Sequence, residues 1–319
     1  MKFSKPPRLV DGDTIGVIAP SLPVSDMRRR YELGISNIKA RGFKVREGRT
    51  VNLVHRGYMA GTDKERADDI NRMFADDEVR GIVCAVGGSV ALRTLRYLDY
   101  DLIQAHPKVF SGMSDITVLH LALLSRAGLS GLHHSDVCFG FGQDLRSSAC
   151  RYETDLFLRV TKNAVPLGPL PSLTIWEAWR GGQAEGRLFG GNCNSIQAVM
   201  GTPYFKKPTG PIIFFFEAYP HTVEAMDRAL AQFREVGLFD HATGMLVGKI
   251  RGNKEDGSIF DLTSETKDVV LDVTSEFDFP VIGSMDFGHH TPNLPLPMGI
   301  NASMDTEKMV VSIDESYVQ

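Results

Sequence analysis

The sequence predicts an α/β fold with a parallel sheet. Two features of its first half indicate this fold: the alternation of strand-like and helix-like segments, and strands that are apolar on both faces. Short, continuously apolar segments alternate with amphipathic segments of helical length between residues 14 and 128. A strand that is apolar on both faces needs cover on both faces. The alternation therefore predicts a three-layer domain, with a parallel sheet between two layers of helices.

Each predicted strand of the first half is followed by a predicted helix. Gly42 ends the first helix, because glycine accepts the left-handed conformation that closes helices. Thr62 or Asp63 is expected to cap the second. The predicted strands cover 14–21, 43–48, 80–86 and 107–112, and the predicted helices cover 26–42, 61–79, 87–99 and 115–128.

The second half predicts a different domain. A stretch rich in Pro and Gly suggests a boundary, so we expect an N-terminal domain over 1–155, a linker over 156–180 and a C-terminal domain over 181–319. The last is expected to be a swivelling α+β domain with a mixed, partly barrel-like sheet. In it, only 195–202 and 222–237 have a helical pattern.

Composition narrows the function classes. A formal charge of −4 and an isoelectric point near 6.1, without a basic run, argue against nucleic-acid binding. The apolar stretches are too short to span a bilayer, and the N-terminus lacks the apolar core of a secretory signal. Four cysteines without CxxC spacing predict reduced thiols of a cytoplasmic protein, with no structural zinc and no cofactor.

The segment "SGMSD" places Ser114 where a buried strand turns into a buried helix. Ser114 and Asp115 could be helix caps, because both side chains satisfy free amides at a helix start. Ser114 could instead be a nucleophile on a tight strand-to-helix turn. The nearby "AVGGS" could place backbone amides of Gly88 and Asp115 around an attacked carbonyl, or it could be an ordinary βα turn.

A nucleophilic serine needs a base and a group that orients the base. Glu217 ends a strongly apolar strand, where a carboxylate is conspicuous, although strand-end charges often face solvent. Asp286, His289 and His290 lie together in a loop bounded by Gly and Pro. These residues are the candidate partners of Ser114.

Histidine pairs leave a metal site open as an alternative. His289 and His290 could be joined as ligands by His133, His134 and Asp136 of "LHHSD". No HExxH or HxH spacing occurs, which disfavours this hypothesis.

Together these motifs resemble the LD-carboxypeptidase family of serine peptidases, which includes muropeptide LD-carboxypeptidases and peptidases that confer self-immunity to microcin C. The resemblance spans nearly the whole chain. Its motifs are "LVDGDTIGVIAPS", "YMAGTDKERADDINRMFADDEVRGIVCAVGG", "PKVFSGMSDITVLHLAL", "AEGRLFGGNCNSIQAVMGTPYF", "IIFFFEAY" and "DFGHHTPNLPLPMGINASMD".

The resemblance implies a triad of Ser114, Glu217 and His289, with Gly88 and Asp115 donating backbone N–H groups to the oxyanion. It also implies a small peptide or peptidyl-nucleotide substrate and a homodimer. The expected reaction cleaves an amide beside a free carboxylate. The alternatives are a metal-dependent hydrolase and a non-catalytic module that binds a small ligand.

Two loops depart from the family pattern and are expected to flank the substrate. The glycine loop reads "GGSVALR", with Val90 where the family usually has Gly or Asn, and "LHHSDV" replaces the family's "HGP". In the microcin-type branch an aromatic residue between the domains stacks on the nucleotide. The candidate substrate-binding residues are Gly87, Ser89, Trp176, Trp179 and His290, and the two tryptophans could instead pack a domain interface.

Overall fold

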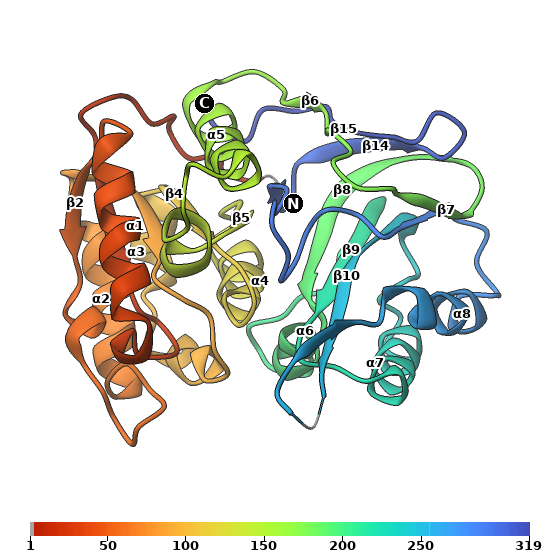
Figure 1. The fold of residues 1–319 in the computed structure, drawn as a ribbon, viewed down its shortest axis with the longest axis horizontal. Coiled ribbons are helices and arrows are strands. Elements are labelled where there is room, and N and C mark those ends of the chain that lie inside the picture. The colour runs from red at the N-terminus through yellow and green to blue at the C-terminus, as the bar shows by residue number, and fades with distance from the viewer. Residues whose placement is uncertain (1–2, 255) are drawn as a thin grey trace.

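The computed structural model describes residues 3–254 and 256–319, which form two α/β domains side by side (Figure 1). The first contains a six-stranded sheet and the second a nine-stranded sheet. The prediction of an α/β protein with a parallel N-terminal sheet and a second sheet is confirmed. No helix among the described residues is long and apolar enough to cross a membrane.

The N-terminal sheet has the strand order β13-β5-β4-β3-β1-β2. All neighbours pair in parallel except β13, which joins the edge antiparallel. The strands are β1 (Thr14–Ile18), β2 (Lys44–Glu47), β3 (Val79–Cys84), β4 (Val109–Gly112), β5 (Leu132–His133) and β13 (Leu296–Pro297).

The helices of this domain form two groups, and the helices within each group contact one another. One contains α1 (Arg28–Ala40), the short π-helical turn η4 (Val137–Phe141) and α5 (Ser148–Lys162). The other contains α2 (Asp63–Ala75), the 3₁₀ segment η3 (Ala91–Tyr97), α3 (Tyr100–Ala105) and α4 (Ile116–Arg126). Further 3₁₀ turns lie at η1 (Ser25–Met27) and η2 (Arg49–Asn52).

Sequence chemistry explains the ends and the burial of these helices. Thr62 begins α2 with a capping box, in which its hydroxyl accepts from the Glu65 amide and the Glu65 carboxylate accepts from the Thr62 amide. Helix α4 is apolar all round because it is buried on all sides: α3 and β5 contact it within its own domain, and α6 and β8 contact it from the other domain.

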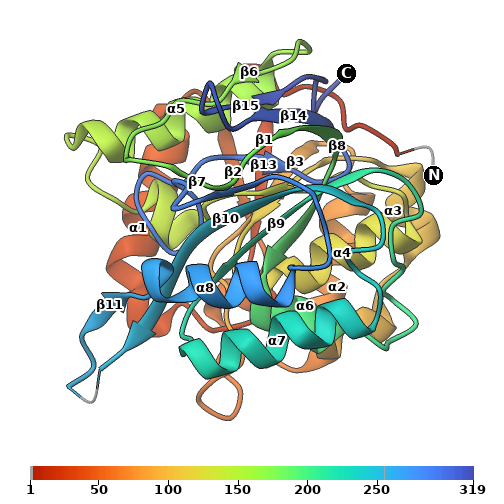
Figure 2. The same cartoon turned by 90° about the vertical axis from the view of Figure 1, so that its right-hand side faces the viewer.

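The C-terminal sheet has the order β6-β15-β14-β8-β9-β10-β12-β7, and β11 pairs with β10. Strands β8, β9, β10 and β12 form its parallel centre. Figure 2 shows α7 and α8 side by side against this sheet, and the two helices contact each other. The strands are β6 (Gly168–Pro169), β7 (Glu177–Arg180), β8 (Gln183–Asn192), β9 (Ile212–Ala218), β10 (Ala242–Asn253), β11 (Ile259–Asp261), β12 (Val281–Gly283), β14 (Asn301–Asp305) and β15 (Val310–Ile313); the helices are α6 (Cys193–Val199), α7 (Val223–Glu235) and α8 (Thr263–Val273).

Three elements differ from the expected ones. The predicted helix over 87–99 is 3₁₀ and begins at Ala91, because the Ala91 amide is bound by the Asp115 carboxylate. The prediction of only two helices in the second half is wrong, because α8 also forms, and half of its buried face consists of threonines, Thr263 and Thr266, beside Val270 and Val273. The expected linker, 156–180, overlaps α5 at its start and includes β6 and β7 of the C-terminal sheet, so residues 163–167 connect the two domains.

The two domains are also joined by chain segments far apart in sequence. Strand β13, from the second half, pairs with β5 of the first domain. The C-terminus returns to the first domain, where the Gln319 amide donates to the Pro6 carbonyl and the Arg8 amide donates to the Gln319 carbonyl. The position of one domain relative to the other is therefore set by several chain segments.

We predict that Gly34→Ala destabilises the protein although alanine is the better helix former by about 1 kcal/mol. Gly34 faces η4, and an added Cβ would lie 2.5 Å from the Val137 carbonyl oxygen. We expect a net loss of about 1–3 kcal/mol in the free energy of unfolding, measured by urea denaturation. Ser36→Ala, on the exposed face of α1, is the control and should stabilise by about 0.5 kcal/mol or less. A stabilised Gly34→Ala would contradict this packing.

Candidate active site

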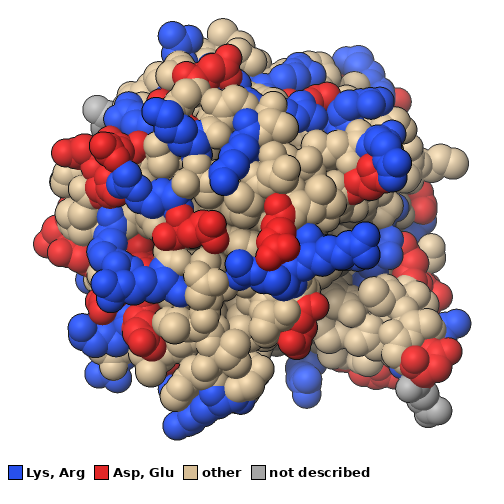
Figure 3. Space-filling view, turned by 60° about the vertical axis from the view of Figure 1, so that its left-hand side comes forward, with Lys and Arg blue, Asp and Glu red and all other residues tan. Residues whose placement is uncertain are grey.

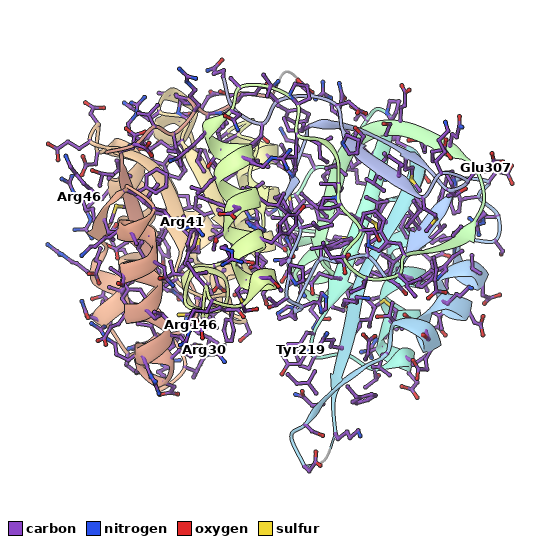
Figure 4. All side chains as sticks on the ribbon, turned by 45° about the horizontal axis from the view of Figure 1, so that its top comes forward. Arg30, Arg41, Arg46, Arg146, Tyr219 and Glu307 are labelled. Carbon is purple, nitrogen blue, oxygen red and sulfur yellow. The ribbon has the colours of Figure 1, made fainter. Side chains whose placement is uncertain are left out.

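A cavity of about 770 Å³ lies between the two domains. Figure 4 shows Arg30 and Tyr219, two of its lining residues, on opposite domains. Figure 3 shows that basic and acidic side chains alternate over one outer face, with no field of a single sign. The predicted residues that line the cavity are Gly87, Gly88, Ser89, Ser114, His289 and His290.

Ser114 lies on the turn between β4 and α4 and has a positive φ of 61°. This conformation is costly for a residue other than glycine, and such residues gather at functional sites. The turn is held from both domains: Gly87 packs so closely that an added Cβ would lie 2.7 Å from Ser114 Cβ, and Ser195 Oγ donates to the Ser114 carbonyl at 3.2 Å. Ser114 is thus a half-buried serine in a constrained turn that lines the cavity.

The Asp115 carboxylate ties this turn to the glycine loop. Asp115 Oδ2 accepts from Ser21 Oγ at 2.5 Å and from the Ala91 amide at 2.8 Å. Within the described chain, its side chain makes no capping hydrogen bond to α4, so the simple cap interpretation does not explain it. Gly88 has a φ of 150°, and an added Cβ would lie 2.3 Å from Ser21 Oγ, so only glycine fits there.

Glu217 and His289 form a close pair in the C-terminal domain. His289 Nδ1 lies 2.7 Å from Glu217 Oε2, and Asn192 Nδ2 donates to Glu217 Oε1 at 3.0 Å. Glu217 is fully buried, which by itself raises its pKa; the charge and hydrogen bond of His289 outweigh burial and hold the pKa below its ordinary value. The carboxylate is therefore ionised and turned toward the imidazole.

Gly288 permits this close approach. Its φ is 105°, and an added Cβ would lie 2.7 Å from Glu217 Cβ. The Gly288 amide donates to Asn293 Oδ1 at 2.9 Å, which fixes the backbone next to His289. The ring of Tyr219 lies 4.9 Å from the His289 ring, centroid to centroid. The imidazole is thus held by a carboxylate, a backbone turn and an aromatic ring.

The lining of the cavity includes a buried carboxyl group, that of Asp136, whose place in "LHHSD" had suggested only a metal ligand. Asp136 Oδ1 accepts from the Phe139 amide at 2.7 Å, and the Gly87 amide also faces this carboxyl. Burial raises the pKa of Asp136 to about 7. Behind it, burial raises the pKa of Glu153 well above its ordinary value, and Glu153 accepts from Ser135 Oγ and the Asn293 amide.

The two tryptophans do not line the cavity. Trp176 is buried and donates from Nε1 to Asp286 Oδ2 at 2.8 Å. Trp179, also buried, lies in β7 against Gly283. The structure therefore places both indoles in the packing of the C-terminal domain, against Asp286 and Gly283.

His290 lines the cavity beside a residue that the sequence did not reveal. Its Nδ1 accepts from Arg251 Nη2 at 3.0 Å. Arg251 comes from the end of β10, and only the fold brings it to His290. Arg30, Phe139 and Tyr219 also line the cavity from separate elements, and only the fold brings them together.

The four histidines of the metal hypothesis face different partners. His289 pairs with Glu217, His290 pairs with Arg251, and the buried His134 contacts the Glu153 carbonyl through Nε2. His133 is buried against the Phe215 ring. Among the described residues, no three His, Cys, Asp or Glu side chains form a group that could hold a metal ion.

Family models match both domains of the chain. The LD-carboxypeptidase N-terminal domain model matches residues 15–134, and the LD-carboxypeptidase C-terminal domain model matches residues 185–304. The chain belongs to the LD-carboxypeptidase family. It is a peptidase-type hydrolase of this family, and the two matched regions contain Ser114 and the Glu217–His289 pair respectively.

Relatives of this LD-carboxypeptidase family member cover nearly its whole length. A probable murein peptide carboxypeptidase of Bacillus subtilis is 31% identical over 315 residues, covering 97% of this chain and 94% of that protein. The microcin C7 self-immunity protein MccF of Escherichia coli is 25% identical, covering 97% and 95%. The structure of MccF in complex with glutamyl sulfamoyl guanosine superposes with a TM-score of 0.90 at 24% identity, covering 99% of each chain, and so shares the fold.

We predict that Asp136→Asn gains stability relative to wild type as pH rises from about 4 to about 7. The pKa of Asp136 is raised from 3.8 to about 7, so the unfolded chain releases this proton first and the wild-type fold loses stability across that window. Asparagine can still accept from the Phe139 amide. Urea denaturation at pH 4.5 and 7.5 measures the difference in unfolding free energy between the two proteins.

Asp305→Asn is the control of opposite sign. Asp305 accepts from the Glu307 and Lys308 amides, and these contacts lower its pKa. Its ionised form stabilises the fold, so wild type should gain relative to Asp305→Asn as pH rises through the ordinary carboxyl range. A wild-type advantage over Asp136→Asn that grows with pH would contradict the assignment of Asp136.

Proposed function

We propose that this chain is a serine carboxypeptidase that cleaves an amide bond beside a free carboxylate, with Ser114, His289 and Glu217 as its triad. The observation that carries the proposal is the 2.7 Å contact between Glu217 Oε2 and His289 Nδ1, at a cavity that Ser114 also lines. A carboxylate on Nδ1 holds the proton there and leaves Nε2 free to act as a base.

In the first step, Ser114 Oγ attacks the scissile carbonyl carbon while His289 Nε2 takes the hydroxyl proton. The carbonyl oxygen becomes an oxyanion, which the backbone N–H groups of Gly88 and Asp115 stabilise. The fixed contacts of Asp115 with Ser21 and Ala91 support this assignment, because they hold the glycine loop against the nucleophile turn. Each such donor contributes about 2.7–4 kcal/mol to the transition state.

In the second step, the C–N bond breaks and His289 returns the proton to the leaving amine. The acyl group remains as an ester on Ser114 Oγ. A water molecule then attacks this ester, with His289 as base, and releases the free acid and the serine. Glu217 stabilises the imidazolium at each stage.

Two substrate classes fit an amide beside an anionic group. One is a muropeptide with an L,D-bond to a terminal D-amino acid, as the name of the Bacillus subtilis relative suggests. The other is an aminoacyl or peptidyl nucleotide, as the ligand-bound MccF structures suggest. Trp176 and Trp179 do not line the cavity, but the rings of Phe139 and Tyr219 do, so both substrate classes are tested below.

We also propose that the protein acts in the cytoplasm as a homodimer. All four cysteines are free and buried, which suits a reducing compartment. The dimer follows from the family resemblance, and light scattering on the purified protein tests it.

We predict that Ser114→Ala lowers the hydrolysis rate by about 10⁴-fold or more, because no other group can form the ester. The measurement is release of D-Ala from a murein tetrapeptide and release of the amino acid from an aminoacyl sulfamoyl adenosine. Ser36→Ala is the control, since Ser36 lies on the exposed face of α1 and outside the lining of the cavity. It should leave most of the activity. Activity that survives in Ser114→Ala would reject the serine mechanism and leave the binding-module or metal hypotheses.

We predict that Glu217→Gln lowers kcat by about 10³- to 10⁴-fold with little change in KM. Glutamine has the same shape, but its amide can donate to Nδ1 and so place the imidazole proton on Nε2, where it blocks the base. Steady-state kinetics measure the effect. Glu224→Gln, at the exposed start of α7, is the matched control and should keep the wild-type kcat. Equal kinetics of Glu217→Gln and wild type would remove Glu217 from the mechanism.

A further inference from the structure

Arg251 is a cationic side chain on the C-terminal-domain wall of the cavity, half-buried and directed by its neighbours. Its Nη2 donates to His290 Nδ1 at 3.0 Å. Because Nδ1 accepts this hydrogen bond, the His290 proton is on Nε2, which lies 3.7 Å from Asp286 Oδ1. His290 thus lies between a guanidinium and a carboxylate.

Asp286 is anchored by hydrogen bonds to the segment before β7. It is fully buried and its Oδ2 accepts from the Leu173 amide at 2.8 Å, the Thr174 amide at 3.1 Å and Trp176 Nε1 at 2.8 Å. The carboxylate that faces His290 Nε2, at a distance too long for a hydrogen bond, is therefore held by a buried structure that includes Trp176.

The guanidinium of Arg251 lacks a counter-ion among the described residues. Its Nη2 donates to the unprotonated Nδ1 of His290, and its Nε is buried with no hydrogen-bond partner in the described structure. A half-buried cation in this state is costly until an anion joins it. A guanidinium presents parallel N–H groups that fit the two oxygens of a carboxylate.

The position of Arg251 also matches the direction of the reaction. Its contact residue, His290, directly follows His289, which gives its proton to the leaving amine in the proposed mechanism. The group bonded to that amine therefore lies on the same wall. In a peptide that ends one residue after the scissile amide, this group bears the terminal carboxylate.

We propose that Arg251 binds the free carboxylate next to the scissile amide, and that His290, Asp286 and Trp176 position its guanidinium. This subsite makes the enzyme a carboxypeptidase, and the assignment rests on the proposed function. His290 and Trp176, two of the five candidate substrate-binding residues, act through Arg251 instead.

Arg30 is the other arginine that lines the cavity, and it differs in setting. It is exposed, comes from α1 on the opposite wall, and has its Cζ 5.0 Å from the centre of the Phe139 ring (Figure 4). That wall carries Ser114 and the glycine loop, so Arg30 faces the acyl side of the substrate. The same substitution at Arg30 is therefore a matched control.

The test compares a murein tetrapeptide ending in D-Ala with the same peptide as its C-terminal carboxamide. Wild type should strongly prefer the acid. In Arg251→Gln, kcat/KM for the acid should fall by about 10- to 100-fold while that for the carboxamide stays nearly constant, so the acid-to-amide ratio falls by the same factor. Arg251→Lys should restore part of the ratio, and Arg30→Gln should leave it unchanged.

His290→Phe tests the positioning role with the same readout. It removes the acceptor of Arg251 and should lower the acid-to-amide ratio by about 3- to 10-fold, the effect of one lost hydrogen bond. A purely structural role would instead lower the rates for both peptides equally. A ratio that is unchanged in both Arg251→Gln and His290→Phe, or that falls in Arg30→Gln instead, overturns the proposal.

Binding to the Ser114→Ala protein separates this subsite from the triad. Calorimetry should show that Arg251→Gln in that background weakens binding of the acid peptide by about 10- to 100-fold and does not change binding of the carboxamide. This result supports the subsite even if wild type cleaves neither peptide, an outcome that would reject only the proposed function. Equal binding of acid and amide by the Ser114→Ala protein overturns the subsite. The subsite is also overturned if Arg251→Gln weakens binding of aminoacyl sulfamoyl adenosine but not of the acid peptide. The anion that Arg251 binds would then not be a carboxylate.

Discussion

The contact between Glu217 and His289 is the constraint on which the rest of the site depends. A carboxylate at the end of the fully buried strand β9 is costly unless a cation or several donors meet it. His289 and Asn192 supply these contacts, and they can do so only because Gly288 has no side chain to collide with Glu217. Strand β9, the end of β8 and the loop after β12 must therefore keep their register for the pair to exist.

This pair becomes useful only when the other domain presents a serine to it. Ser114 belongs to a turn that Gly87 and Ser195 hold from different domains, and β13 connects the loop after His289 to the edge of the N-terminal sheet. Strand pairing thus holds the proposed nucleophile and base together, in addition to the 163–167 connection. This arrangement suits a reaction that needs a fixed distance between Ser114 Oγ and His289 Nε2.

The sequence could predict the parts of this site that depend on local patterns. Alternating apolar segments predict the parallel sheet, and "GMSD", "FFFEAY" and "FGHH" predict three side chains by motif. Contacts across the fold had no such signal. Arg251 meets His290 only because β10 lies beside β9 and β12, and Asp136 reaches the cavity only because η4 folds under the glycine loop. Helix α8 was missed because two of the four residues on its buried face, Thr263 and Thr266, are polar, which hides the helical period in the apolar pattern.

The tryptophans illustrate how a motif can name the right segment and the wrong contact. An indole is large and apolar with a single donor, so it can stack on a ligand or anchor a buried carboxylate. Trp176 does the second, since its Nε1 is directed at the buried Asp286. In the proposed subsite, a residue expected at the substrate acts one step behind it, through Asp286 and His290. Specificity at the cavity wall then depends on the guanidinium that this chain orients, and a change to Trp176 should alter preference for the leaving group before it alters the triad.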